Sequence, residues 1–176
     1  MIQNIEGNLF DSNAHIIAHQ VNCQGVMGSG VAKQVKERFP HVYRHYKTYI
    51  DLHSGNALGE IQIIPINPDN YDEKGKIIEL PNAQYICNIF AQDCYGYDGK
   101  QYTDLCALRI CFEQICELVT SDDLNWRGSV IAMPWKIGCV RGGANWERDV
   151  FPMIEEILGN CNVELWKLPE GGEGNV

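Results

Sequence analysis

Long apolar runs are absent from this 176-residue sequence. No window approaches the roughly 20 apolar residues that a helix needs to cross a bilayer. The first ten residues, MIQNIEGNLF, also lack the basic start and the apolar centre of a secretory signal peptide. These absences predict a cytoplasmic protein with no membrane partner.

Positive charge is scarce. The sequence holds 14 Lys and Arg residues against 23 Asp and Glu residues, which gives a formal net charge of -9. Long-range electrostatics therefore repel a polyanion, so bulk binding of nucleic acid is disfavoured. A small anionic ligand is still compatible with this charge, because backbone N–H groups at a helix N-terminus can hold a diphosphate.

Metal-binding cysteine pairs are missing as well. The eight cysteines lie inside apolar segments such as YICNIF and LCALRICFEQIC, and no CxxC pair occurs. Cys106, Cys111 and Cys116 are five residues apart, so a helix would rotate each of them about 140° from the last. We expect reduced thiols, no metal site and no cofactor.

The sequence does contain a regular alternation of strand and helix patterns, without repeats or linkers. Residues 1–169 are predicted to form one α/β domain, and residues 170–176 a disordered tail. Short apolar runs predict strands at 1–10, 15–22, 59–66, 84–91, 129–134 and 162–168. Stripes of helical spacing predict helices at 31–39, 40–50, 104–119 and 150–158. Between two strands we expect a mobile loop at 67–76 and a ribbon extension at 76–80. This order predicts a mainly parallel or mixed sheet with helices on both faces.

Two glycine-rich segments, 25–30 and 138–143, follow predicted strands. Ligands of such folds bind beyond the carboxyl ends of the strands, so we expect both segments at one cleft. The first is not a nucleoside-triphosphate loop, because Val31 and Ala32 stand where that pattern needs Lys and then Ser or Thr. It also fails the dinucleotide fingerprint, since Lys33 replaces the third glycine. Backbone capture of a diphosphate fits the glycines, and a plain strand-to-helix turn is the alternative.

The stretches HQVNCQGVMGSGVAKQVKERFP and MPWKIGCVRGGANWERDVFPMIEEIL resemble the two ligand loops of macro domains, the Appr-1-p processing family. The opening GNLF is similar to the GDLF of the branch that contains the terminal ADP-ribose protein glycohydrolases. The resemblance runs in order across nearly the whole chain. It implies a three-layer α/β/α sandwich with a six-stranded mixed sheet, and a cleft that binds ADP-ribose or an ADP-ribosylated substrate.

The resemblance also implies which residues contact the ligand. The first loop would embrace the distal ribose and part of the diphosphate, and it comprises Gln24, Gly25, Val26, Met27, Gly28, Ser29, Gly30 and Val31. The second would close over the diphosphate, and it comprises Ile137, Gly138, Cys139, Val140, Arg141, Gly142 and Gly143. Adenine would lie near Asn8 and Leu9. Phe90 is similar to a residue that covers the distal ribose or the adenine, with core packing as its alternative.

The chain departs from the family pattern at the catalytic positions. Asn8 stands where macro domains usually carry Asp, and Gly142 stands where the glycohydrolase branch has its catalytic Asp. The lysine of that branch has no clear counterpart, since Lys100 lies too far along. We therefore expect Asn22 to orient a ribose hydroxyl or a water, with capping of the loop as the alternative. Asp98 is expected to act as a general base if its loop folds over the cleft, with turn chemistry as the alternative.

Three functions stay open on this evidence. The first is hydrolysis of an ADP-ribosyl bond, in protein-linked ADP-ribose or in an ADP-ribose derivative. The second is non-catalytic reading of ADP-ribose or ADP-ribosylated protein. The third is phosphatase action on ADP-ribose 1''-phosphate, in which Arg141 would hold the terminal phosphate. His19, inside the strand that precedes the first loop, is interpreted as a satisfied core histidine.

Overall fold

The computed structural model describes residues 1–53, 55–69 and 84–169. They form a mixed sheet of six strands in the order β1-β6-β5-β2-β4-β3. All neighbouring strands are parallel except β3 and β4. The strands are β1 (Ile2–Glu6), β2 (Ile16–Asn22), β3 (Ile61–Pro65), β4 (Tyr85–Gln92), β5 (Val130–Pro134) and β6 (Asn162–Lys167). The predicted sheet is confirmed.

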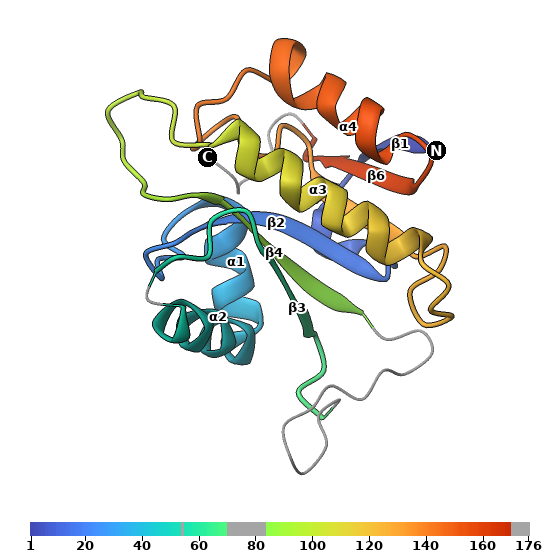
Figure 1. The fold of residues 1–176 in the computed structure, drawn as a ribbon, viewed down its shortest axis with the longest axis horizontal. Coiled ribbons are helices and arrows are strands. Elements are labelled where there is room, and N and C mark those ends of the chain that lie inside the picture. Colours follow the sequence, from blue (N-terminus) through green and yellow to red (C-terminus); the bar gives the residue numbers. More distant parts are fainter. Residues whose placement is uncertain (54, 70–83, 170–176) are drawn as a thin grey trace.

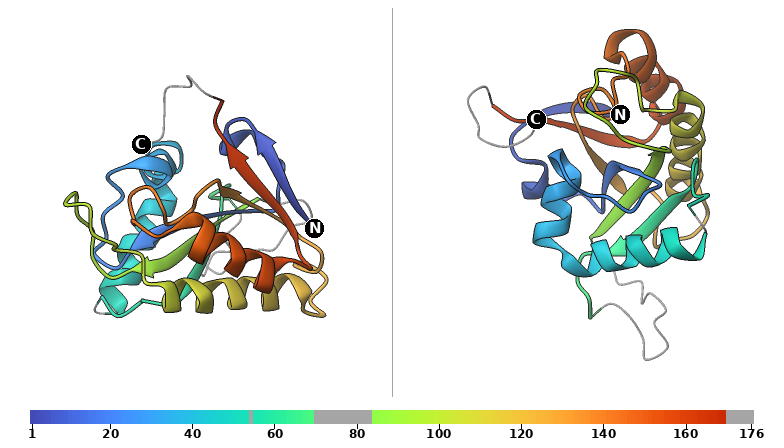
Figure 2. Two further views of the ribbon diagram at one scale, coloured as in Figure 1. Left: turned by 90° about the horizontal axis from the view of Figure 1, so that it is seen from above. Right: turned by 90° about the vertical axis from the view of Figure 1, so that its left-hand side faces the viewer.

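Helices cover both faces of this sheet (Figures 1 and 2). They are α1 (Gly30–Arg38), α2 (Pro40–Leu52), α3 (Leu105–Thr120) and α4 (Phe151–Leu158), with a short 3-10 turn η1 (Leu9–Asp11) and a π turn η2 (Trp146–Val150). α1 and α2 pack together on one face, and α3 and α4 pack together on the other. The three-layer α/β/α architecture is therefore present.

The central strand β2 is buried on both sides, and its side chains alternate between two hydrophobic cores. Ile16 and Ala18 pack in the core under α3 and α4. Ile17 and Val21 pack in the core under α1 and α2. This explains why the strand begins with three consecutive apolar residues, Ile16, Ile17 and Ala18, instead of an apolar-polar alternation.

Helix α4 begins with an irregularity that the sequence indicates. Pro152 is its second residue, where a proline costs no hydrogen bond within the helix. The preceding residues form a wider turn, in which Val150 N donates to Asn145 O at 3.1 Å. The sequence had left two interpretations open, a helix start near Val150 or an irregular turn before it, and the structure contains both.

Other expectations fall on parts of the chain that the structure does not describe. The ribbon extension at 76–80, most of the loop at 67–76 and the tail at 170–176 lie there. In the described ranges, no helix combines the length and the hydrophobicity needed to cross a membrane.

Candidate functional site

A cleft opens where two central strands part. β2 and β5 pair only through Ile16–Ile131 and Ile17–Ala132, whereas β2 continues beside β4 as far as Asn22. A cavity of about 360 Å³ lies at this opening and is lined by both glycine-rich loops. The predicted convergence of the two loops on one cleft is therefore present in the structure.

Twelve of the predicted site residues line this cavity: Leu9, Asn22, Val26, Gly28, Ser29, Gly30, Val31, Ile137, Gly138, Val140, Arg141 and Gly142. The remaining ones do not: Asn8, Gln24, Gly25, Met27, Phe90, Asp98, Cys139 and Gly143. Three residues of the second group, Gly25, Met27 and Phe90, are buried, whereas Gln24, Asp98 and Gly143 are exposed outside the cavity.

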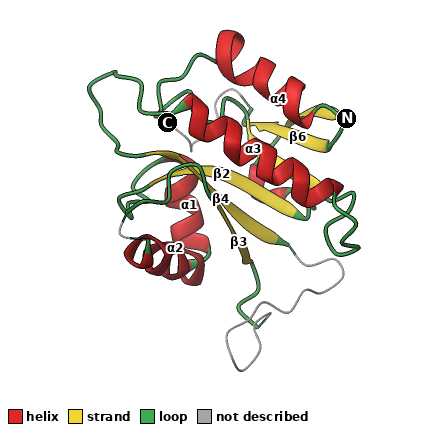
Figure 3. Ribbon diagram, in the orientation of Figure 1, coloured by secondary structure: helices red, strands yellow, loops and turns green. Residues whose placement is uncertain are grey.

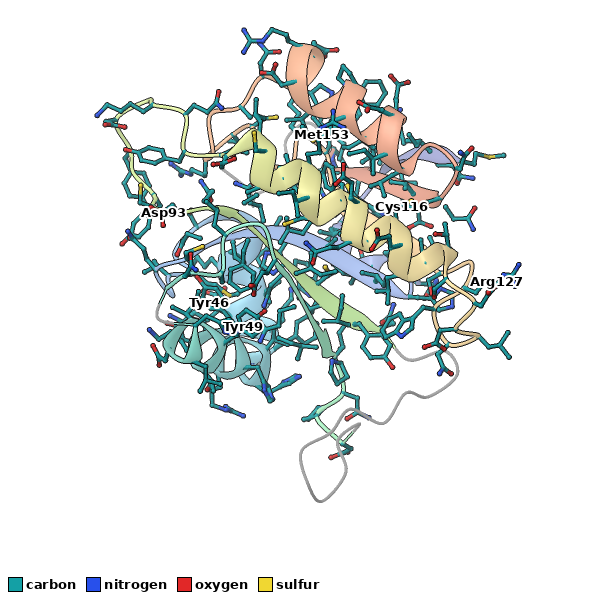
Figure 4. The ribbon with its side chains drawn as sticks, viewed as in Figure 1. Tyr46, Tyr49, Asp93, Cys116, Arg127 and Met153 are labelled. Atoms are coloured by element: carbon teal, nitrogen blue, oxygen red, sulfur yellow. The ribbon has the colours of Figure 1, made fainter. Side chains whose placement is uncertain are left out.

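Asn22 holds the first loop together. Its Oδ1 accepts hydrogen bonds from Gln24 N at 3.0 Å, Val26 N at 3.2 Å and Tyr46 Oη at 3.0 Å, and its Nδ2 donates to Val26 O at 2.7 Å. Tyr46 Oη also donates to the Asn22 carbonyl at 2.7 Å. Figure 4 shows Tyr46 reaching from α2 toward the sheet, so this helix anchors the loop. One Nδ2 hydrogen of Asn22 is left for a ligand or a water.

The first loop ends at the N-terminus of α1. The helix begins at Gly30, whose φ of 56° lies in the left-handed region, and Ser29 makes no side-chain cap. Lys33 N is the first helical amide that bonds back, to Ser29 O at 3.1 Å. The backbone N–H groups before it therefore stay available at the cavity wall, in the arrangement that binds anions.

The second loop is fixed by a residue that the sequence analysis missed, Thr103. Its Oγ1 accepts from Gln20 Nε2 at 2.9 Å and donates to Gly138 O at 2.7 Å. Its backbone N donates to Gly142 O at 2.9 Å. A Cβ at Gly142 would collide with Thr103 Oγ1 and with the Gly138 carbonyl. This packing explains why an Asp is not accommodated at position 142.

The cavity is positive although the protein is acidic. Lys136, Arg141 and Lys167 line it, and no Asp, Glu or Cys is among its described lining residues. Lys136 adopts a φ of 59°, a strained conformation for a residue with a side chain. The Arg141 guanidinium carbon lies 5.3 Å from the centre of the Tyr97 ring. These charges favour an anionic ligand such as a diphosphate.

Asp98 lies outside the cavity, and the structure does not support its role as a general base. Its Oδ1 accepts from Tyr102 Oη at 2.7 Å, and its Oδ2 pairs with Lys100 Nζ at 2.7 Å. The Lys100 ammonium and the Tyr102 hydroxyl lower the pKa of the carboxyl group. The long loop between β4 and α3 that carries it is drawn in green in Figure 3.

Two expected ligand contacts are used elsewhere in the fold. Phe90 is fully buried and stacks on Tyr46 and Tyr49, with ring centres 5.8 and 5.3 Å away, so the prediction that it covers the ligand is wrong and the core alternative holds. The Asn8 Oδ1 accepts from Phe10 N at 3.0 Å and caps the η1 turn. Leu9, beside it, does line the cavity.

His19 was expected in the core and instead lines the cavity. The sequence favours a satisfied core histidine, yet this side chain lines the cavity and neither ring nitrogen makes a hydrogen bond. Its imidazole is 1% exposed, and burial lowers its pKa to about 4. The sequence carries no signal for this, because the parting of β2 and β5 is a tertiary feature.

The fold and the cavity together define an α/β ligand-binding domain whose site lies beyond the carboxyl ends of its central strands. No protein-family model matches the chain. Several curated relatives and solved structures are similar to the chain. The chain is 29% identical over 157 residues to an ADP-ribose 1''-phosphate phosphatase of Meyerozyma guilliermondii, an alignment that covers 81% of this chain and 86% of the relative. It is also 29% identical over 169 residues to a DNA ADP-ribosyl glycohydrolase of Thermus aquaticus, covering 94% of this chain and 40% of the relative.

Solved structures agree with these relatives. The macrodomain of Thermus aquaticus DarG is 25% identical with a TM-score of 0.71, over 96% of this chain and 97% of that one. The Thermosipho africanus DarTG structure in complex with ADP-ribose has a TM-score of 0.72 at 21% identity, over 98% of this chain and 42% of that one. The chain has the macro-domain fold, and over most of its length it is similar to proteins named for ADP-ribose processing.

Proposed function

We propose that this domain binds ADP-ribose and hydrolyses a bond at the distal ribose of an ADP-ribose derivative. The observation that carries the proposal is the cavity itself, which two glycine loops enclose and three cationic residues line. Its volume of about 360 Å³ lies in the range of small-molecule sites. The relatives named for ADP-ribose chemistry support the same ligand class.

The diphosphate would lie against the first turn of α1. Gly28, Ser29 and Gly30 present backbone there, and a ligand anion can accept from the free amides. Arg141 and Lys136 approach from the second loop and would neutralise the remaining charge. Such a site captures a diphosphate although the protein carries a net charge of -9.

Hydrolysis in this site would depend on the positioning of the attacking water more than on an acidic side chain that acts as a general base. No carboxylate lines the described part of the cavity. Asn22 keeps one Nδ2 hydrogen that can hold a ribose hydroxyl or the attacking water. Backbone amides and cations would stabilise charge that develops on the ligand, and the enclosed geometry would align the water.

A second candidate reaction is removal of the phosphate from ADP-ribose 1''-phosphate. Arg141 favours it, because a guanidinium at the cavity wall can hold a terminal phosphate with two parallel hydrogen bonds. The phosphatase names among the relatives support it too. Both reactions would use the same cavity and differ in the bond that breaks.

One experiment separates these reactions. The protein is incubated with ADP-ribosylated protein, with O-acetyl-ADP-ribose and with ADP-ribose 1''-phosphate, and the products are followed by mass spectrometry. Release of ADP-ribose from the protein or the acetyl derivative supports the first reaction, and inorganic phosphate supports the second. Tight binding of ADP-ribose without turnover of any substrate would contradict both reactions and leave a reader of ADP-ribose.

A further inference from the structure

Two cysteines from different elements lie in contact outside the cavity. Cys161 Sγ donates to Cys116 Sγ at 3.6 Å. Cys116 belongs to α3, and Figure 4 labels it on the side of that helix that faces α4. Cys161 lies in the turn between α4 and β6. Because the two residues are 45 positions apart in the sequence, the tertiary fold is what brings their sulfurs together.

The two thiols differ in exposure. Cys161 is 4% exposed, and burial together with the contact to Cys116 raises the pKa of its thiol to about 11. Cys161 is therefore protonated near pH 7 and shielded from solvent. Cys116 is half-buried and packs at the margin of the hydrophobic core. A peroxide oxidises a cysteine only where it reaches the sulfur, so oxidation can begin at Cys116 and be completed by Cys161.

Other cysteines of α3 and the sheet are placed differently. Cys87 and Cys111 are fully buried in the core, where a peroxide cannot reach them, and Cys111 Sγ donates to the Glu60 carbonyl at 3.3 Å. Cys106, near the start of α3, is exposed to solvent. All eight cysteines are free thiols in the structure, so any disulfide bond has to be formed by oxidation.

Strand β6 separates the two sulfurs from the cavity. Cys161 directly precedes β6, whereas Trp166 and Lys167 line the cavity at the other end of the strand. A strand rises about 3.3 Å per residue, so roughly 15 Å lie between the two ends. Chemistry at the two cysteines is therefore independent of the proposed binding of ADP-ribose.

We propose that Cys116 and Cys161 form a reversible disulfide bond when the protein meets hydrogen peroxide, and that this bond ties α3 to the start of β6. The Cys116 thiolate attacks a peroxide oxygen. The S–O bond forms and the O–O bond breaks, which leaves a sulfenic acid, and the departing hydroxide takes up the proton lost by the thiol.

The second step uses the neighbouring thiol. Cys161 Sγ attacks the sulfenic sulfur, the S–S bond forms, the S–O bond breaks, and the departing hydroxide takes the Cys161 proton. Two thiols are thus oxidised, and one peroxide is reduced to two waters. Rotation of the two side chains can close the gap between the sulfurs to a bond of about 2 Å. A dithiol reductant restores both thiols.

The first test uses the wild-type protein. Reduced protein is treated with hydrogen peroxide, the remaining thiols are alkylated, and unreduced tryptic peptides are analysed by mass spectrometry. We expect the peptide 110–127, which holds Cys111 and Cys116, to be joined to the peptide 149–167, which holds Cys161. Fragmentation should place the bond on Cys116, and dithiothreitol should release both peptides. Absence of this cross-link, or a bond through Cys111, would overturn the proposal.

Three alanine variants test the order of the steps. In Cys161→Ala the sulfenic acid lacks its partner, so dimedone should label Cys116. In Cys116→Ala dimedone should leave Cys161 unlabelled. The control Cys106→Ala removes an exposed cysteine of the same helix and should keep the cross-link. An unlabelled Cys116 in the first variant, a labelled Cys161 in the second or a lost cross-link in the control would each overturn the proposal.

Thermal melting measures what the bond does to the fold. A disulfide restricts the unfolded chain, so the oxidised wild type should melt about 4 °C or more above the reduced protein. Cys106→Ala should show the same rise, and Cys116→Ala treated with peroxide should show none. An unchanged melting temperature in wild-type protein that mass spectrometry shows to be cross-linked would overturn the proposed tie between α3 and β6.

Discussion

Replacing Asn22 with Ala removes the side chain that shapes the first loop. Three hydrogen bonds disappear, two accepted by Oδ1 from the Gln24 and Val26 amides and one donated by Nδ2, while the Tyr46 hydroxyl keeps its bond to the Asn22 carbonyl. A hydrogen bond contributes about 1 kcal/mol net, and the part-buried amides of Gln24 and Val26 can turn to water, so we expect a loss of about 2 to 3 kcal/mol in the free energy of unfolding. For a domain of this size that corresponds to a fall in melting temperature of roughly 4 to 12 °C.

The same substitution should weaken ADP-ribose binding, because the ligand must then order the loop that Asn22 holds in the wild type. If about half of the lost hydrogen-bond energy is local to the loop, affinity falls roughly tenfold. Calorimetry with ADP-ribose measures this, alongside thermal melting. Asn162→Ala is the matched control, since Asn162 is exposed at the far end of β6 and makes one hydrogen bond, to Gly128 O at 3.3 Å. An Asn22→Ala protein with wild-type affinity would refute the reasoning.

Three further predictions follow from the same structure. Gly28→Ala should bind ADP-ribose nearly as the wild type does, because the nearest atom to a new Cβ is Val26 Cγ1 at 3.6 Å. Gly28→Glu should abolish binding and leave the circular dichroism spectrum unchanged. Comparable binding by both variants would place the ligand elsewhere. His19 has a folded pKa of about 4 against an ordinary value of 6.5, so the unfolded chain binds more protons between these values and stability falls as the pH drops through them. Urea unfolding of the wild type should lose about 2.5 kcal/mol more between pH 7 and 4.5 than that of His19→Leu, and equal losses would contradict the burial of a neutral imidazole. Asp98→Asn should leave turnover within about twofold of the wild type, since the carboxylate is bound to Lys100 and Tyr102 outside the cavity; a larger fall in turnover would restore it as a candidate base.

The local patterns of the sequence predicted the layers and the two loops well. A short apolar run predicted the buried strand at 15–22, which is β2, and glycines after strands predicted the loops that enclose the cavity. These features depend on residues close together in the chain. Their physical cause, burial on two faces and close approach of backbone, can be inferred from a short segment.

Other parts of the site depend on residues far apart in the sequence. The hydrogen bonds of Thr103 with Gln20 and Gly138 connect three segments, and none of these residues stands out alone. His19 looks like a core residue until β5 is seen to leave β2 beside it. Phe90 was assigned by resemblance, but the Tyr46 and Tyr49 rings of α2 enclose it in the core.

The central claim is that ADP-ribose binds between the two glycine loops, and titration calorimetry of the wild-type protein with ADP-ribose and with AMP tests it most directly. We expect saturable binding of ADP-ribose, weaker binding of AMP, and a stabilisation of about 2.7 kcal/mol at a ligand concentration one hundred times the Kd. Gly28→Glu in the same titration should give no heat. No heat and no thermal shift for the wild type at millimolar ADP-ribose would contradict the claim.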